Sequence, residues 1–189
     1  RDRKEVAPYY HKRWAREEVG PVNVTNELIK LSKIKSGDCV LDLACGTGLV
    51  TKKITRKVGK NGIIYAIDTS KTAINIAKKW VGMKENLHFI IADAETIQFN
   101  TKFDAITCQY ALFFFPNAQK VLKNLKKILK KNGMITMSVH SKTNVPYFDS
   151  ILNPVKKFIP DYLPKYPELD RFGTTKSFKE ELSLIHISE

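Results

Sequence analysis

From Cys39 to Gly48 the chain reads Cys-Val-Leu-Asp-Leu-Ala-Cys-Gly-Thr-Gly, and this stretch decides the fold. An apolar run ends in a glycine turn, and the helical pattern of residues 49–58 follows, which predicts a buried strand, a tight turn and a helix. A doubly wound α/β domain builds its nucleotide-binding corner in this way, with small residues that let a ligand approach the backbone. No third glycine follows Gly48 as in the fingerprint G-x-G-x-x-G, so the sequence does not favour a pyrophosphate ligand.

A second apolar run, residues 63–67, ends at Asp68. Ser70 is a natural N-cap for the amphipathic helix predicted over residues 71–81, so Asp68 lies at the carboxyl end of its strand. A carboxylate in that position can accept hydrogen bonds from both hydroxyls of a ribose. The alternative is that Asp68 only helps to cap the helix.

Three further runs have the pattern of strands. They cover residues 87–91, shortly before Asp93, residues 103–108, which lead into Gln109, and residues 134–139, which follow a helical pattern over residues 118–130 and the pair Asn132-Gly133. Strands that alternate with helices predict a parallel sheet, and the carboxyl ends of parallel strands lie at the same edge of that sheet. We therefore expect Gly46, Asp68 and Asp93 to share a rim.

Taken in order, these strand ends resemble the motifs of class I S-adenosylmethionine-dependent methyltransferases. Residues 42–48 are similar to the first motif, acidic-x-(Gly/Ala)-x-Gly-x-Gly. Residues 109–117 are similar to the fourth motif of the small-molecule branch, Gln-x-Ala-Leu-x-Phe-Phe-Pro, in which menaquinone- and ubiquinone-type enzymes fall. Before the fifth strand the chain lacks the family's usual proline and one of its two glycines, which relaxes that turn without removing it.

The resemblance implies a Rossmann-like doubly wound α/β fold with parallel strand order 3-2-1-4-5, and S-adenosyl-L-methionine as the cofactor. In this family the acidic residue at the position of Asp93 faces the adenine amino group, and the backbone amide of Ala94 donates to the ring. The residues expected to bind the cofactor are Asp42, Ala44, Cys45, Gly46, Thr47, Gly48, Asp68, Thr69, Asp93, Ala94 and Gln109.

The implied activity is C- or O-methylation of a small molecule. An RNA or protein methyltransferase is the enzymatic alternative, and a cofactor-binding module without turnover is the alternative of another class. Methyl transfer from a sulfonium depends mainly on positioning and on exclusion of water, so no catalytic residue is compulsory. Should the acceptor need a general base, the candidates are His140, Tyr110 and His11, each with a structural role as an equal alternative.

The net charge of +13 raises the possibility of a nucleic-acid or anionic membrane partner. The lysines are scattered over predicted helix faces without the interleaved aromatic residues on which bases stack, so a solvated surface is favoured, although an RNA substrate stays possible. The three cysteines lack metal-ligand spacing, and we expect no metal site. No apolar run approaches the roughly 20 residues of a membrane helix, and a cytoplasmic location is expected.

We divide the chain into four segments. Residues 1–140 hold N-terminal helices and the cofactor-binding core, residues 141–173 form a proline-punctuated lid or substrate insertion, residues 174–181 begin the last helix, and residues 182–189 resemble a translated sequencing adapter. On this hypothesis the family's antiparallel strands 6 and 7 are missing through C-terminal truncation, and the fifth strand is an unpaired edge. The N-terminal helices either fold across the cofactor or pack Tyr9, Tyr10 and Trp14 onto the core.

Overall fold

The computed structural model describes residues 6–16, 22–139 and 174–183. Residues 1–138 and residues 139–189 form two separate units. In the first unit, a sheet of five parallel strands has the order β3-β2-β1-β4-β5, which confirms the predicted order. The strands are β1 (Cys39–Leu43), β2 (Ile63–Asp68), β3 (Leu87–Ile91), β4 (Phe103–Gln109) and β5 (Leu129–Ser138).

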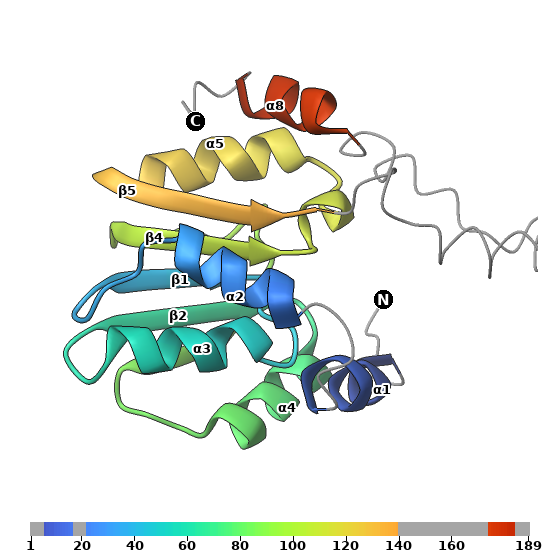
Figure 1. The fold of residues 1–189 in the computed structure, drawn as a ribbon, viewed down its shortest axis with the longest axis vertical. Helices are drawn as coiled ribbons and strands as arrows, with labels where there is room; N and C mark the ends of the chain where they lie inside the picture. Colours follow the sequence, from blue (N-terminus) through green and yellow to red (C-terminus); the bar gives the residue numbers. More distant parts are fainter. Residues whose placement is uncertain (1–5, 17–21, 140–173, 184–189) are drawn as a thin grey trace, which may run out of the picture. The chain divides into compact units, whose positions relative to one another are not determined.

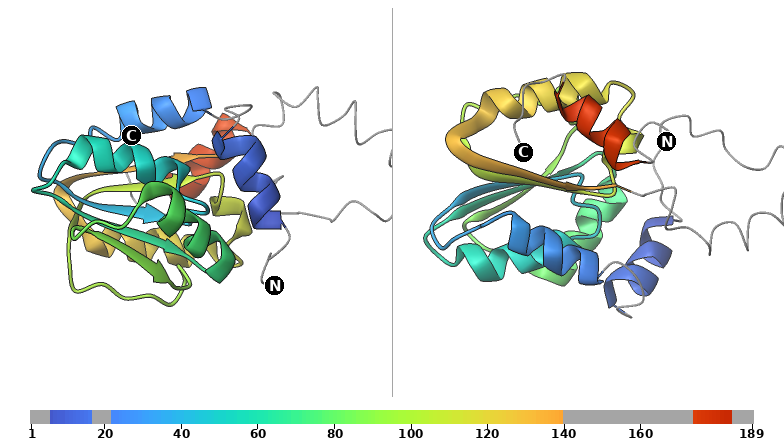
Figure 2. Two further views of the ribbon diagram at one scale, coloured as in Figure 1. Left: turned by 90° about the horizontal axis from the view of Figure 1, so that it is seen from below. Right: turned by 45° about the horizontal axis from the view of Figure 1, so that its top comes forward.

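Helices cover both faces of this sheet (Figures 1 and 2). The helical segments of the first unit are α1 (Val6–Tyr10), the π-helix His11–Arg16, α2 (Val22–Leu31), α3 (Leu49–Val58), α4 (Lys71–Val81), the 3-10 helix Leu112–Phe114 and α5 (Ala118–Ile128); α8 (Thr175–Ser183) lies in the second unit. The predicted bounds of α3 and α4 are confirmed, and Ser70 caps α4 by accepting from the Ala73 backbone amide at 3.2 Å. The predicted lid, residues 141–173, and residues 184–189 lie outside the described residues.

Successive residues of the central strands face two different hydrophobic cores. In β1, Val40 belongs to the core beneath α2, α3 and α4, whereas Leu41 and Leu43 belong to the core beneath α5. The segment between β3 and β4 has no helix, and Phe99 from this segment packs into the core on the α5 side. Burial on both faces explains why the central strands read as apolar runs instead of alternating patterns.

The fifth strand begins earlier than the sequence predicted. The expected helix extends to residue 130, but α5 ends at Ile128 and β5 starts at Leu129. The pairing between β4 and β5 has an irregularity here, since Phe103 lies opposite Leu129 while Ala105 lies opposite Met134. Lys130 stabilises the extended conformation because its Nζ donates to both carboxylate oxygens of Asp104, each at 2.8 Å. Asn132 and Gly133 lie inside β5, in the stretch between these two pairings, so the predicted turn before the fifth strand is wrong.

Candidate functional site

The carboxyl ends of the strands meet at one edge of the sheet. Backbone hydrogen bonds continue the pairing past the strand ends, from the Cys45 amide to the Ile67 carbonyl (2.9 Å) and from the Ala92 amide to the Asp68 carbonyl (3.0 Å). β1 lies between β2 and β4, so this edge contains the point where the direction of chain winding reverses (Figure 1). Open α/β sheets bind their ligands in the crevice at such a point. Of the three residues expected to share a rim, Asp68 ends β2, and Gly46 and Asp93 follow β1 and β3, all at this edge.

The two glycines of the turn after β1 serve different purposes. Both have positive φ, 54° for Gly46 and 92° for Gly48. A Cβ added to Gly48 would lie 2.8 Å from Val81 Cγ2 and 3.1 Å from Ala77 Cβ, so Gly48 lets α3 pack closely on α4. A Cβ added to Gly46 would meet nothing within 4 Å. Gly46 therefore borders open space at the rim, as a backbone that a ligand approaches must do.

Asp68 ties the two neighbouring turns together. Its Oδ2 accepts from the Gly46 backbone amide at 2.9 Å, and its Oδ1 accepts from the Ser70 backbone amide at 2.8 Å. The first turn of α4 is capped by the Ser70 hydroxyl and not by this carboxylate. A carboxylate has about four lone-pair positions, so each oxygen can still accept another hydrogen bond. Asp68 is partly exposed and is thus able to bind hydroxyl groups at the rim.

Asp42 lies beneath the turn and not on the rim. Its side chain is 1% exposed, its Oδ2 accepts from the Thr51 hydroxyl at 2.5 Å, and its Oδ1 accepts from the Thr107 hydroxyl at 2.9 Å. Burial raises the pKa of this carboxyl to about 6, although the two hydroxyl donors oppose the shift. Sequence reasoning missed Thr51 and Thr107. The hydroxyls stand out only once the register places Thr107 opposite Asp42.

The other predicted cofactor residues differ in exposure. Ala44 has φ 54° in the turn; Cys45, Thr47 and Ala94 are buried, Thr69 and Asp93 are exposed, and Gln109 is half-buried. The Asp93 carboxylate accepts from the Glu95 amide at 2.8 Å, and Gln109 Oε1 accepts from the Thr25 hydroxyl of α2 at 3.0 Å. Burial raises the pKa of the Cys45 thiol and that of Cys108, the latter to about 12, so both thiols stay protonated at neutral pH.

The candidates for a general base lie in three different situations. Tyr110 is half-buried at the end of β4, with φ 52° and a pKa raised by burial, and its backbone amide donates to the Ser138 carbonyl. The His11 ring packs edge-on against Trp80 of α4, with ring centroids 4.8 Å apart. His140 lies outside the described residues.

The N-terminal tyrosines do not pack onto the core. Tyr9 is 64% exposed and Tyr10 is 46% exposed, so that interpretation is wrong for these two residues. The side chain of Trp14 lies outside the described part of the chain. Buried Ala7 and the contact of His11 with Trp80 attach this segment to α4.

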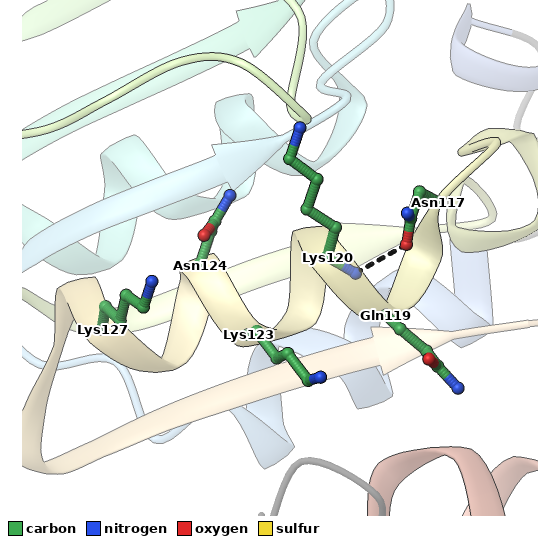
Figure 3. A pocket seen from close by; sticks show the side chains of 6 residues that line it. All are labelled: Asn117, Gln119, Lys120, Lys123, Asn124 and Lys127. Carbon is green, nitrogen blue, oxygen red and sulfur yellow. Dashed lines mark hydrogen bonds between the residues drawn. The ribbon is translucent and has the colours of Figure 1, made fainter.

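A separate hollow of about 460 Å³ runs along α5 (Figure 3). Its lining is polar and carries no carboxylate: Asn117, Gln119, Lys120, Lys123, Asn124 and Lys127. None of the predicted cofactor residues lines it, and it offers no aromatic ring on which a base can stack. Among the described residues, no three His, Cys, Asp or Glu side chains gather as metal ligands, and no described helix is long and apolar enough to cross a membrane.

Comparisons with known proteins agree with this geometry. Residues 34–162 match the family model described as "Methyltransferase domain". The chain is 30% identical over 153 residues to the ubiquinone/menaquinone biosynthesis C-methyltransferase UbiE of Hydrogenovibrio crunogenus, covering 75% of this chain and 60% of that protein. It is 28% identical over 150 residues to the demethylmenaquinone methyltransferase of Staphylococcus saprophyticus, covering 79% of this chain and 60% of that protein. The chain thus spans about 60% of the length of these relatives.

The fold also matches solved structures. A putative methyltransferase from Bacillus halodurans superposes with a TM-score of 0.66 at 23% identity, covering 86% of this chain and 68% of that one. At this identity the structural similarity supports the fold alone, whereas the family model and the sequence relatives establish family membership. The chain belongs to the methyltransferase domain family.

Proposed function

We propose that this chain is the cofactor-binding part of an S-adenosylmethionine-dependent methyltransferase that acts on a small molecule. The observation that carries the proposal is the hydrogen bond between the Gly46 amide and the Asp68 carboxylate at the point where the winding reverses, beside open space at Gly46. Family membership and the names of the relatives support it. The glycine turn lacks the third glycine of the dinucleotide fingerprint, so the rim fits an adenosyl group better than a pyrophosphate.

Each rim residue then has a defined task. The free lone pairs of Asp68 accept the ribose hydroxyls, and Asp93 accepts from the adenine amino group while the Ala94 amide donates to the ring. The backbone from Ala44 to Gly48, together with Thr69 and Gln109, lines the remainder of the site. When bound, the cofactor supplies a methyl group on a positively charged sulfur, which the acceptor displaces. The protein's contribution is to orient the two reactants and to exclude water.

We further propose an acceptor of the quinone class, methylated on a ring carbon, and a cytoplasmic location. The relatives are named for ubiquinone and menaquinone biosynthesis, and the residues after β4 resemble the small-molecule branch. The displacement at carbon requires an electron-rich ring, so the hydroquinone is the form that reacts. His140, Tyr110 and His11 stay the candidates for a general base that removes the ring proton.

Transfer of labelled methyl groups tests this function. The full chain is incubated with methyl-labelled S-adenosylmethionine and, separately, a demethylmenaquinone-type hydroquinone, total RNA or total protein. We expect label in the quinone extract only. Label in RNA with binding that weakens steeply with salt would favour the RNA alternative, for which the +13 charge is the one supporting observation. Cofactor binding without transfer to any acceptor would favour the binding module.

A further inference from the structure

The buried carboxylate of Asp42 connects three elements around the glycine turn. Asp42 lies in β1, Thr51 lies in the first turn of α3, and Thr107 lies opposite Asp42 in β4. All three side chains are buried, and each carboxylate oxygen accepts one hydroxyl. The strand before the turn, the helix after it and the neighbouring strand are therefore joined through one side chain.

The position of the turn depends on these connections. The turn spans only residues 44–48 between β1 and α3, and it is closed by the Gly48 amide, which donates to the Cys45 carbonyl at 3.0 Å. A shift of α3 relative to β1 would move both ends of this short segment. The first group to be displaced would be the Gly46 amide, whose bond to Asp68 is the central contact of the rim.

Burial of a charge at this position is costly unless hydrogen bonds compensate for the lost water. An apolar side chain would fill the same space without that cost. An apolar residue, however, cannot fix the relative orientation of the elements. Two hydrogen bonds to a charged acceptor fix the distance and angle between the elements that they join.

We propose that Asp42 is a positioning residue, which holds α3 and β4 against β1 so that the Gly46 amide is aimed at Asp68, and which makes no contact with the cofactor. This inference rests on the proposed function of the rim. It assigns to Thr51 and Thr107 a part in cofactor binding, although neither reaches the rim surface.

Variants of Thr51 provide the test, with S-adenosylhomocysteine as the probe. Thr51→Val removes the hydroxyl, Thr51→Ser keeps it, and Thr55→Val is the matched control, because the Thr55 hydroxyl bonds only to the Lys52 carbonyl within α3. Calorimetry should show affinity at least tenfold weaker for Thr51→Val, restored to within about threefold by Thr51→Ser and unchanged for Thr55→Val. Wild-type affinity in both Thr51→Val and Thr107→Val would overturn the proposal.

A double-mutant cycle separates positioning from direct contact. If Asp42 acts through its hydroxyl partners, the losses of affinity in Asp42→Asn and Thr51→Val should not add in the double variant. Loss in Asp42→Asn alone, with no effect of the threonine variants, would identify a direct cofactor contact and contradict the proposal.

A measurement made without ligand distinguishes failure of the positioning proposal from failure of the proposed function. The ¹H–¹⁵N chemical shift and the hydrogen-exchange rate of the Gly46 amide should change in Thr51→Val and stay as in the wild type in Thr55→Val. If the wild-type chain binds no S-adenosylhomocysteine, the proposed function fails, and this measurement alone decides the positioning role. Unchanged Gly46 signals in Thr51→Val would refute it.

Discussion

The two sides of the rim differ in how firmly their polar groups are held. On the β1–β2 side, Asp68 accepts from the amides of Gly46 and Ser70, and Asp42 accepts from two hydroxyls. On the side of β5, the buried hydroxyls of Thr136 and Ser138 have no hydrogen-bond partner among the described residues. One side is fixed before any ligand arrives, while the other retains unused hydrogen-bonding capacity.

This difference indicates that the two sides have different functions. A site that recognises an invariant cofactor benefits from preorganisation, because little ordering is left to be done on binding. Uncommitted buried polar groups are unusual in folded proteins and call for a partner. We therefore expect substitutions of the bonded residues to change stability and cofactor affinity, and substitutions of Thr136 and Ser138 in β5 to change neither.

Gly48→Ala should have the largest effect. The new Cβ would enter a backbone conformation with φ 92° and would contact Val81 and Ala77, so we expect the free energy of unfolding to fall by about 2–4 kcal/mol. Gly37→Ala is the control, since Gly37 has φ 89° but open space around it; its loss should be about 1–2 kcal/mol. Urea unfolding measures both. Equal losses would mean that packing against α4 is unimportant.

The pH dependence of stability reports on Asp42. Its pKa is about 6 in the folded chain, above the ordinary value of 3.8, because burial favours the neutral form. Between these two pH values the folded chain binds more protons than the unfolded one. The stabilisation is thus fully present below about pH 4 and is lost as the pH rises through 6, amounting to at most about 3 kcal/mol. Asp42→Asn should flatten this part of the curve; an unchanged curve would contradict the assignment.

Gly46→Ala should separate binding from stability. The added methyl group would enter the open space at the rim, where it meets no protein atom but would obstruct a ligand. We expect affinity for S-adenosylhomocysteine to fall at least tenfold, about 1.4 kcal/mol, while the free energy of unfolding falls by about 1 kcal/mol for the strain at φ 54°. Unimpaired binding by calorimetry would place the ligand elsewhere.

The smallest effect is expected at Thr136. Thr107 and Thr136 lie opposite each other in β4 and β5, but only the Thr107 hydroxyl is bonded within the described residues. Thr107→Val should destabilise the fold by about 1–3 kcal/mol, because the buried carboxylate loses a donor, whereas Thr136→Val should change stability by about 0.5 kcal/mol or less. Similar losses in the two variants would remove the contrast between the bonded hydroxyl of Thr107 and the unbonded hydroxyl of Thr136.

The strand order was predicted from the resemblance to a known family, whereas local patterns in the sequence were enough to predict the parallel strands, the helix after each of the first two strands and the Ser70 cap. They also placed Gly46 and Asp68 at one edge, because parallel strands bring their carboxyl ends together. These features depend on residues close together in the chain, or on the rules of parallel sheets.

The features that escaped prediction depend on contacts between distant residues. Asp42 is buried, and its hydrogen-bond partner Thr107 lies 65 positions away in the sequence. β5 starts at Leu129 and includes Asn132-Gly133, and Lys130 near its start pairs with Asp104, 26 positions away. The hydrophobic pattern of a single segment does not reveal a partner that lies far away in the sequence.

Calorimetric titration of S-adenosylhomocysteine into the wild-type chain, Asp68→Ala and Asp38→Ala tests the central claim, that the strand ends of β1 and β2 hold the adenosyl group. Asp38 lies at the opposite end of β1, so its variant controls for loss of a carboxylate. The account predicts that Asp68→Ala binds at least tenfold more weakly and that Asp38→Ala binds as the wild type does. Equal affinity in all three proteins would contradict it.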